Sequence, residues 1–130
     1  MPKRPALPRL SEAQLELMQL IWELDETTVG EVWRRLSARR RVARNTVLTL
    51  MERLVKKGWL ERRADGHVYR YSAAVPRQAT LGRIVRRLVD TAFGGSADGL
   101  VAALLDERGV TAAEAERIRK LIDKSRRPKS

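Results

Sequence analysis

The spacing of apolar residues changes at Gly58, and this change restricts the folds open to the chain. Before it, residues 44–57 place apolar side chains at the i, i+3, i+4 spacing of one helical face, and glycine commonly ends a helix. After it, WLERR and HVYRYS contain β-branched and aromatic residues around an Asp65-Gly66 turn signal, with Tyr69 and Tyr71 on one face. The pattern therefore predicts a helix over 44–57 followed by a β-hairpin.

Two further helices are predicted earlier in the chain, each opened by a capping box. Ser11 with Gln14 begins the first, and Thr28 with Glu31 begins the second, because such side chains satisfy free backbone N–H groups. The charged run SARRRVAR has no apolar period and indicates the turn before the third helix. Three helices and a basic hairpin predict a winged helix-turn-helix over residues 11–75, a mainly α fold with a small β-hairpin. The expected buried stripe of the first helix is Leu15, Met18, Leu20, Ile21, Trp22 and Leu24.

A helical dimerisation domain is predicted over residues 76–124. Pro76 marks its start, GGS at 94–96 interrupts it, and a third capping box, Thr111 with Glu114, opens its last helix. Its short amphipathic helices bury little surface alone, and a second copy of the same segment is the simplest partner. The residues expected in the dimer interface are Leu81, Ile84, Val85, Leu88, Leu100, Leu104, Leu105, Ile118, Leu121 and Ile122.

The charge of the chain favours partners that carry phosphate. Lys and Arg number 27 against 16 Asp and Glu, a formal net charge of +11. Residues 31–71 hold twelve basic and four acidic groups, a local excess of +8, so the positive charge centres on the third helix and the hairpin. Residues 1–10 are expected to form a flexible basic arm, and residues 125–130 a basic tail.

Several classes of site are not expected. The chain has no cysteine and one histidine, which excludes disulfides and thiolate metal sites and argues against any metal centre. No catalytic constellation or cofactor motif is present, so we expect neither enzymatic activity nor a cofactor. The tryptophans lie on apolar stripes or at a strand start, which favours core packing over stacking on bases. The longest apolar run, LVAALL, is far below the roughly 20 residues that span a bilayer, so we expect a soluble, cytoplasmic protein.

The face of the third helix opposite its apolar stripe is expected to contact DNA. A helix in the major groove presents such a face to base edges, while flanking cations meet phosphates. Asn can pair with adenine, and Leu and Thr methyl groups can contact thymine methyl groups. The expected base-reading residues are Asn45, Thr46, Leu48 and Thr49. The expected phosphate contacts are Arg44, Arg53, Lys56, Arg62, Arg63 and Arg70.

Two other functions fit the same pattern. One is a non-specific nucleic-acid-binding protein of the architectural or RNA-binding kind, for which strong positive charge suffices. The other is an adaptor whose winged helix binds a protein surface. A specific repressor should prefer its operator over random duplex by about 10³ or more. For an adaptor, a pull-down should instead recover a protein complex that withstands both salt and nuclease.

Three segments carry a family resemblance in their order and spacing: LSEAQLELMQLIWE, NTVLTLMERLVKKGWLERR and GHVYRYS. From about Leu10 to about Lys124 the chain resembles the BlaI/MecI penicillinase-repressor family of bacterial transcriptional regulators. The resemblance implies a winged-helix domain, a C-terminal dimerisation domain, and repression by a homodimer on an inverted-repeat operator. For members that control β-lactam resistance, it also implies derepression when a membrane sensor protease signals and the repressor is cut within its dimerisation domain.

The sequence departs from the family pattern at two points. Leu48 stands where the family often has a basic residue, so a different operator sequence is expected. The family's Asn-Phe cleavage bond aligns with Ala103-Leu104, the possible proteolysis site here, so we expect induction not to use that cut. Copper-responsive relatives carry a C-terminal cysteine cluster, which this chain lacks.

Overall fold

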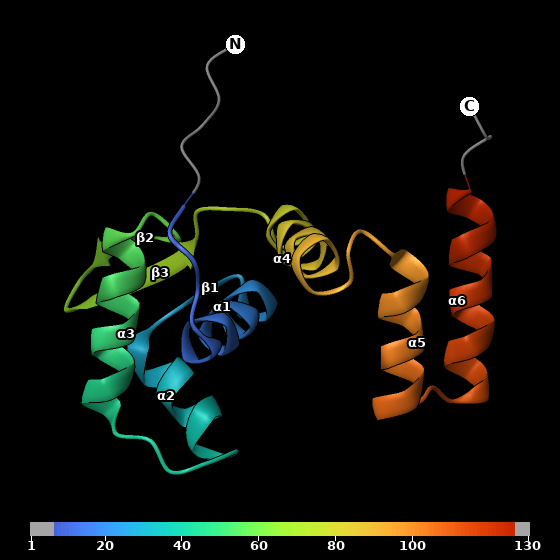
Figure 1. The fold of residues 1–130 in the computed structure, drawn as a ribbon. Coiled ribbons are helices and arrows are strands. Elements are labelled where there is room, and N and C mark those ends of the chain that lie inside the picture. Colours follow the sequence, from blue (N-terminus) through green and yellow to red (C-terminus); the bar gives the residue numbers. More distant parts are fainter. Residues whose placement is uncertain (1–6, 127–130) are drawn as a thin grey trace. The chain divides into compact units, whose positions relative to one another are not determined.

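The computed structural model describes residues 7–126, and the chain divides into two compact units within helix α4, after Gly82 (Figure 1). The predicted fold class, mainly α with a small β-hairpin in a winged helix-turn-helix, is confirmed. The first unit contains α1 (Glu12–Leu24), β1 (Glu26–Thr27), α2 (Val29–Ser37), α3 (Arg44–Lys56), β2 (Leu60–Asp65) and β3 (Val68–Ala73). The second contains most of α4 (Arg77–Ala92), with α5 (Ala97–Glu107) and α6 (Ala112–Ser125).

Capping boxes open α1 and α6, as the sequence predicts. The Ser11 hydroxyl accepts a hydrogen bond from the Gln14 N–H at 3.2 Å, and Gln14 Oε1 accepts one from the Ser11 N–H at 2.9 Å. Thr111 and Glu114 make the same pair of bonds at 3.1 Å each. These local bonds satisfy N–H groups that have no partner within the helix.

The capping box predicted for α2 is only half formed. The Thr28 hydroxyl accepts from the Glu31 N–H at 3.2 Å. The Glu31 carboxylate does not return a bond to Thr28, because it pairs with Arg34 and Arg35 one turn further along the helix. The prediction of a complete second box was therefore wrong, although the helix begins where it was expected.

The core of the first unit lies between α1, α2, α3 and the sheet. Leu17 is fully buried but was not on the predicted stripe of α1, whereas Leu15, Trp22 and Leu24 are only half-buried. The difference arises because α1 contacts α2, α3 and β3, which shifts the centre of its buried face. The core residues are Leu17, Met18, Leu20, Ile21, Val32, Leu36, Val47, Met51, Leu54, Trp59, Leu60 and Tyr71.

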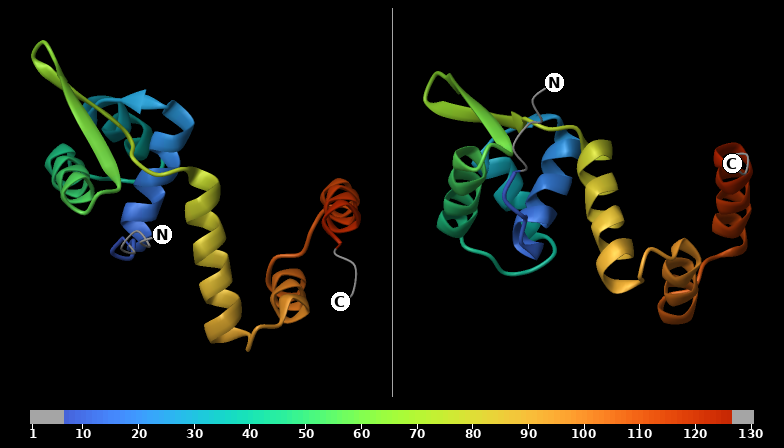
Figure 2. Two further views of the ribbon diagram at one scale, coloured as in Figure 1. Left: turned by 90° about the horizontal axis from the view of Figure 1, so that it is seen from above. Right: turned by 45° about the horizontal axis from the view of Figure 1, so that its top comes forward.

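The hairpin belongs to a three-stranded antiparallel sheet in the order β1-β3-β2. Asp65 pairs with Val68, which leaves Gly66 and His67 as a two-residue turn, and Gly66 has a φ of 63° that glycine adopts without strain. The third strand, β1, was not predicted, because two residues are too few to show alternation. The hairpin projects beyond the three helices (Figure 2).

Each tryptophan ties an irregular segment to the first unit, and all three pack in or against the core, which confirms the predicted packing role. Their indole N–H groups donate to backbone carbonyl oxygens in the segment before α1, the α2–α3 turn and the segment between β3 and α4. The pairs are Trp59 with Pro8 at 2.9 Å, Trp33 with Val42 at 2.9 Å and Trp22 with Val75 at 3.0 Å.

The predicted arm and tail are described only in part. Leu7 and Leu10 pack against the core, and a Leu7 methyl lies 3.2 Å from the position of a Cβ at Gly58. The end of the predicted arm nearest α1 is therefore held against the first unit. Residues 1–6 of the arm and 127–130 of the tail lie outside the described residues.

The sequence places the domain boundary at Pro76. In the structure the two units divide six residues later, after Gly82. Thr80, in the first turns of α4, is buried and donates a hydrogen bond to the Pro76 carbonyl oxygen at 2.9 Å. These first turns group with the winged helix because that is where their contacts lie.

Candidate nucleic-acid interface

Helix α3 carries its apolar and polar residues on two faces. The outer face holds the predicted base-reading residues, of which Asn45 and Thr46 are exposed and Leu48 and Thr49 are half-buried. The Thr49 hydroxyl donates to the Asn45 carbonyl oxygen at 3.0 Å, so the methyl group of Thr49 is the part left for a partner. The fully buried residues of the inner face are Val47, Met51 and Leu54.

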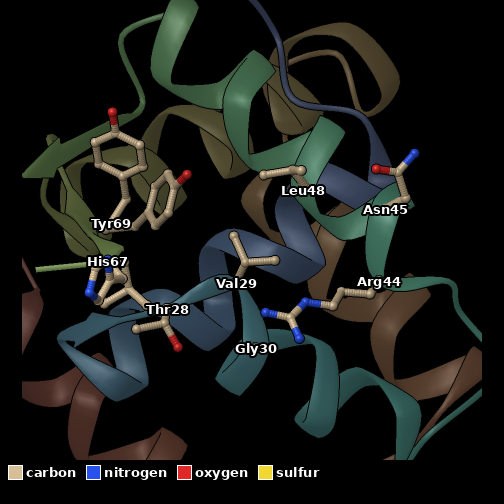
Figure 3. Close-up of a pocket in the computed structure, with 10 residues that line it drawn as sticks. Thr28, Val29, Gly30, Arg44, Asn45, Leu48, His67 and Tyr69 are labelled. Carbon is tan, nitrogen blue, oxygen red and sulfur yellow. The ribbon is translucent and has the colours of Figure 1, made fainter. Parts of the chain in front are cut away.

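A hollow of about 520 Å³ opens between α3, the start of α2 and the hairpin (Figure 3). Arg44, Asn45 and Leu48 are the predicted DNA contacts that line it, whereas Thr46 and Thr49 do not. Leu48 points from α3 toward Tyr69 on the hairpin. The hollow therefore joins the outer face of α3 to one face of the hairpin.

The register of the hairpin places the three predicted arginines on two different faces. Arg62 lies opposite Tyr71, and Arg63 lies opposite Arg70. Paired residues of neighbouring strands share a face, and successive residues alternate. Tyr71 is buried against the helices, so Arg62 lies on the helix side of the sheet and the other two arginines lie on its outer side.

The two sides of the hairpin also differ in their charge partners. On the outer side, Arg63 donates to both carboxylate oxygens of Glu26, at 2.8 and 3.0 Å, and Arg70 donates to Asp65 at 2.6 Å. On the helix side, the Arg62 guanidinium lies over the Tyr69 ring, 4.4 Å from its centroid. Only the outer cations are neutralised by carboxylates.

Both outer carboxylates remain charged at neutral pH. The hydrogen bond from Arg63 is the main reason that the pKa of Glu26 lies below its ordinary value. The hydrogen bond from Arg70 lowers the pKa of Asp65 in the same way. Each carboxylate therefore offsets the charge of its arginine throughout the physiological range.

The remaining predicted phosphate contacts flank α3. Arg44, Arg53 and Lys56 are exposed, and none of them forms an ion pair within residues 7–126. Part of the basic run before α3 is neutralised, because Arg39 and Arg40 reach Glu16 of α1 at 3.8 and 2.6 Å. Arg44, Arg53 and Lys56 therefore keep cationic groups free of carboxylates along α3 among the described residues.

Tyr69 and the start of α2 are parts of the site that the sequence did not single out. The hollow is lined by Tyr69 and by Thr28, Val29 and Gly30. An aromatic residue among basic residues in a hairpin is a usable signal for Tyr69. The start of α2 had no such signal, because its position beside α3 is set by tertiary packing.

The predicted dimerisation residues lie on α4, α5 and α6, and most of them are exposed. Leu81, Leu100 and Ile118 are half-buried. Ala103 is exposed and Leu104 is 41% exposed, and their peptide bond lies inside α5. The exposed apolar residues are Ile84, Val85, Leu88, Val101, Leu104, Leu105, Leu121 and Ile122.

Neither a metal-binding cluster nor a single membrane-spanning helix occurs within residues 7–126. Within that range, no cluster of three or more His, Cys, Asp or Glu residues is placed to hold a metal ion. No single helix there is long and apolar enough to cross a membrane, and only the bent pair of α4 and α5 reaches that length and composition when taken together.

Comparison with known proteins places these features in a family context. Residues 10–124 match the family described as penicillinase repressor. The penicillinase repressor of Bacillus licheniformis is 23% identical over 123 residues, covering 95% of this chain and 96% of the relative. The transcriptional regulator BlaI of Mycobacterium tuberculosis is 31% identical over 113 residues, covering 85% and 82%.

A solved structure of a relative bound to DNA also matches part of this chain. Monomeric Bacillus licheniformis BlaI in complex with the blaP half-operator has a TM-score of 0.50 and 32% identity. The match covers 56% of this chain and 89% of the solved one.

Proposed function

Since this chain belongs to the penicillinase repressor family of DNA-binding transcriptional repressors, we propose that it represses transcription as a homodimer on a pseudopalindromic operator. A related BlaI binds the blaP half-operator in its solved complex. Because a two-fold symmetric dimer binds two equivalent half-sites, their centres should lie roughly 10 base pairs, or a multiple of that, apart. A repressor must reach genomic DNA, so we propose a cytoplasmic location.

The observation that carries this proposal is the combination of an outward face on α3 with unpaired cations around it. The outer face presents Asn45 and the methyl groups of Leu48 and Thr49, which suit contacts with adenine and thymine in the major groove. Arg44, Arg53 and Lys56 would hold phosphates beside the groove. Leu48 replaces a residue that is often basic in the family, so the operator should differ from the family's usual sequence.

Dimerisation through α4, α5 and α6 is part of the proposal. The helices α4, α5 and α6 expose eight large leucine, isoleucine and valine side chains, and soluble monomers seldom leave so much apolar surface without a partner. A second copy of the same helices provides a self-complementary partner under two-fold symmetry. The related half-operator complex contains a monomeric form, so the dimer of this chain rests on its own exposed residues.

We further propose that the regulated genes are of the β-lactam-resistance type and that a membrane sensor protease relieves repression. The support is the similarity to penicillinase repressors. The bond that aligns with the family's cut, Ala103-Leu104, lies inside α5, so we propose that the sensor relieves repression without a cut at this bond.

Two rival functions remain testable alternatives. A non-specific architectural protein would use the same cations without sequence preference, because phosphate contacts alone carry no sequence information. A protein-interaction adaptor would present the outer face of α3 to another protein. The arrangement of Asn45 and Leu48 beside unpaired cations favours the specific DNA reader.

The decisive experiment measures binding of the full chain to a selected operator and to random duplex at several salt concentrations. Wild-type protein should prefer the operator by about 10³ or more. Asn45→Ala should cost about 1–3 kcal/mol on the operator and much less on random duplex. Arg53→Ala should weaken both and reduce the slope of log K against log salt by about 1. Equal losses on both duplexes for Asn45→Ala would show that α3 does not read bases.

A further inference from the structure

The hairpin carries three arginines, Arg62, Arg63 and Arg70, that look equivalent in sequence but differ in structure. Arg62 lies on the helix side of the sheet. Leu60 and Tyr71 on the same side pack against the helices and are only 2% and 1% exposed. Arg63 and Arg70 lie opposite each other on the outer side. On the helix side of the hairpin, Tyr69 and Tyr71 line the hollow beside α3.

The outer pair of arginines is already occupied. The two-bond contact of Arg63 with Glu26 spans the sheet from β2 to β1, and Arg70 is bound to Asp65 within the hairpin. Glu26 uses two of the five N–H donors of Arg63, and each carboxylate already offsets the positive charge that a phosphate would otherwise neutralise. If these arginines bound phosphates, they would therefore release few counterions from the DNA and add little to its salt-dependent binding.

Arg62 is free of carboxylates and lies in a cation–π contact. Its guanidinium carbon lies 4.4 Å from the centroid of the Tyr69 ring, and no ion pair to it occurs within residues 7–126. None of the hydrogen bonds among residues 7–126 uses a side-chain N–H of Arg62, so its five donors remain available to a phosphate. The contact with Tyr69 also holds a long side chain in place, which reduces the ordering cost of binding.

We propose that Arg62, positioned by Tyr69, is the phosphate contact of the hairpin, and that Arg63 and Arg70 serve the structure of the sheet instead. This inference rests on the proposed function, because it requires DNA to lie along α3 and the helix side of the hairpin. Tyr69 is a positioning residue that acts through Arg62. The inference revises the sequence-based expectation that all three arginines contact phosphates.

Two charge-neutral double variants test the assignment with the full chain and random-sequence duplex. Glu61→Gln with Arg62→Gln removes Arg62 without changing net charge, and Glu26→Gln with Arg63→Gln does the same for Arg63. The first should reduce the slope of log K against log salt by about 1, and the second should leave it unchanged. Equal slopes for the two variants, or a loss only in the second, would overturn the assignment. Circular dichroism and thermal melting show whether each variant folds.

The role of Tyr69 is tested by comparing Tyr69→Phe with Tyr69→Leu. Phe keeps the ring and should bind as wild type does, whereas Leu should weaken binding by about 2- to 5-fold, the range expected from an exposed cation–π contact. In the Arg62→Gln background, Tyr69→Leu should have no further effect. An equal effect in both backgrounds would mean that Tyr69 acts only on the fold. If wild-type protein bound no duplex in a salt-dependent way, the proposed function itself would fail.

Discussion

At the scale of single residues, identical side chains have different roles because of what lies across the sheet from them. Arg62 and Arg63 are adjacent in the chain, yet one stacks on Tyr69 and the other binds Glu26. The alternation of side chains along a strand separates them onto opposite faces. The contribution of each arginine to DNA binding thus depends on its neighbours in space.

The Glu26–Arg63 pair predicts a measurable pKa change. Arg63→Gln should raise the pKa of Glu26 toward its ordinary value, because the hydrogen bond from Arg63 is the largest cause of its lowering. Because the pKa of Glu26 is lower in the folded protein than in the unfolded chain, its ion pair with Arg63 stabilises the fold at pH values above the unfolded-state pKa. This contribution to the free energy of unfolding is lost as the pH falls through the folded-state pKa. Carboxyl NMR titration of wild type and variant measures the pKa of Glu26 in each. Arg70→Gln is the control and should act mainly on Asp65, so an unmoved Glu26 in Arg63→Gln would contradict the pairing.

At the scale of elements, side chains hold irregular segments in place where helices and strands end. The α2–α3 turn is tied to the body of the first unit by the bond from Trp33 to the Val42 carbonyl. This turn carries the basic run and leads into α3, whose first residue follows Ala43 without a side-chain cap. The position of the proposed reading helix therefore depends partly on this indole.

Trp33→Phe should keep most of the packing but remove the N–H donor. We expect a loss of about 0.5–1.5 kcal/mol in the free energy of unfolding, the usual net value of one hydrogen bond. Urea unfolding followed by circular dichroism measures it. Tyr69→Phe is a suitable control, since no hydrogen bond of its hydroxyl occurs among residues 7–126. Equal losses in both variants would argue against a role for the indole bond.

At the scale of the whole molecule, the proposed dimer should dissociate when a charged residue replaces an exposed apolar residue of α4. Leu88→Glu would place an unpaired charge in the interface, at a cost of several kcal/mol, and should yield monomers in analytical ultracentrifugation. Arg86→Gln changes net charge by the same amount at a residue of α4 that is already charged, and should remain a dimer. A chain ending at Tyr71 should be monomeric, and a dimer of that fragment would place the interface elsewhere.

The second whole-molecule prediction concerns proteolysis. Proteases preferentially cut exposed loops, and the Ala103-Leu104 bond lies inside α5. Co-expression with a sensor of the penicillinase type should therefore leave the chain intact on a denaturing gel. The Bacillus licheniformis penicillinase repressor in the same cells is the positive control. A single fragment ending at Ala103 would refute the prediction.

The sequence alone determined the features that depend on near neighbours in the chain. Capping boxes at Ser11 and Thr111, the change of period at Gly58 and the two faces of α3 all arise from contacts within a few residues, so they are visible in a linear pattern. The family motifs and the surplus of basic residues near α3 likewise predicted a DNA-binding winged helix.

Tertiary structure decided what depends on segments distant in sequence. Glu26 meets Arg63 across 37 positions, and Trp59 meets Pro8 across 51, and no local pattern encodes either pairing. The two-residue strand β1 exists only because β3 lies beside it, and it brings Glu26 to the outer side of the sheet. Which hairpin arginine remains free of a carboxylate was therefore set by strand pairing, because the sequence presents Arg62 and Arg63 as equals and only the sheet separates their faces.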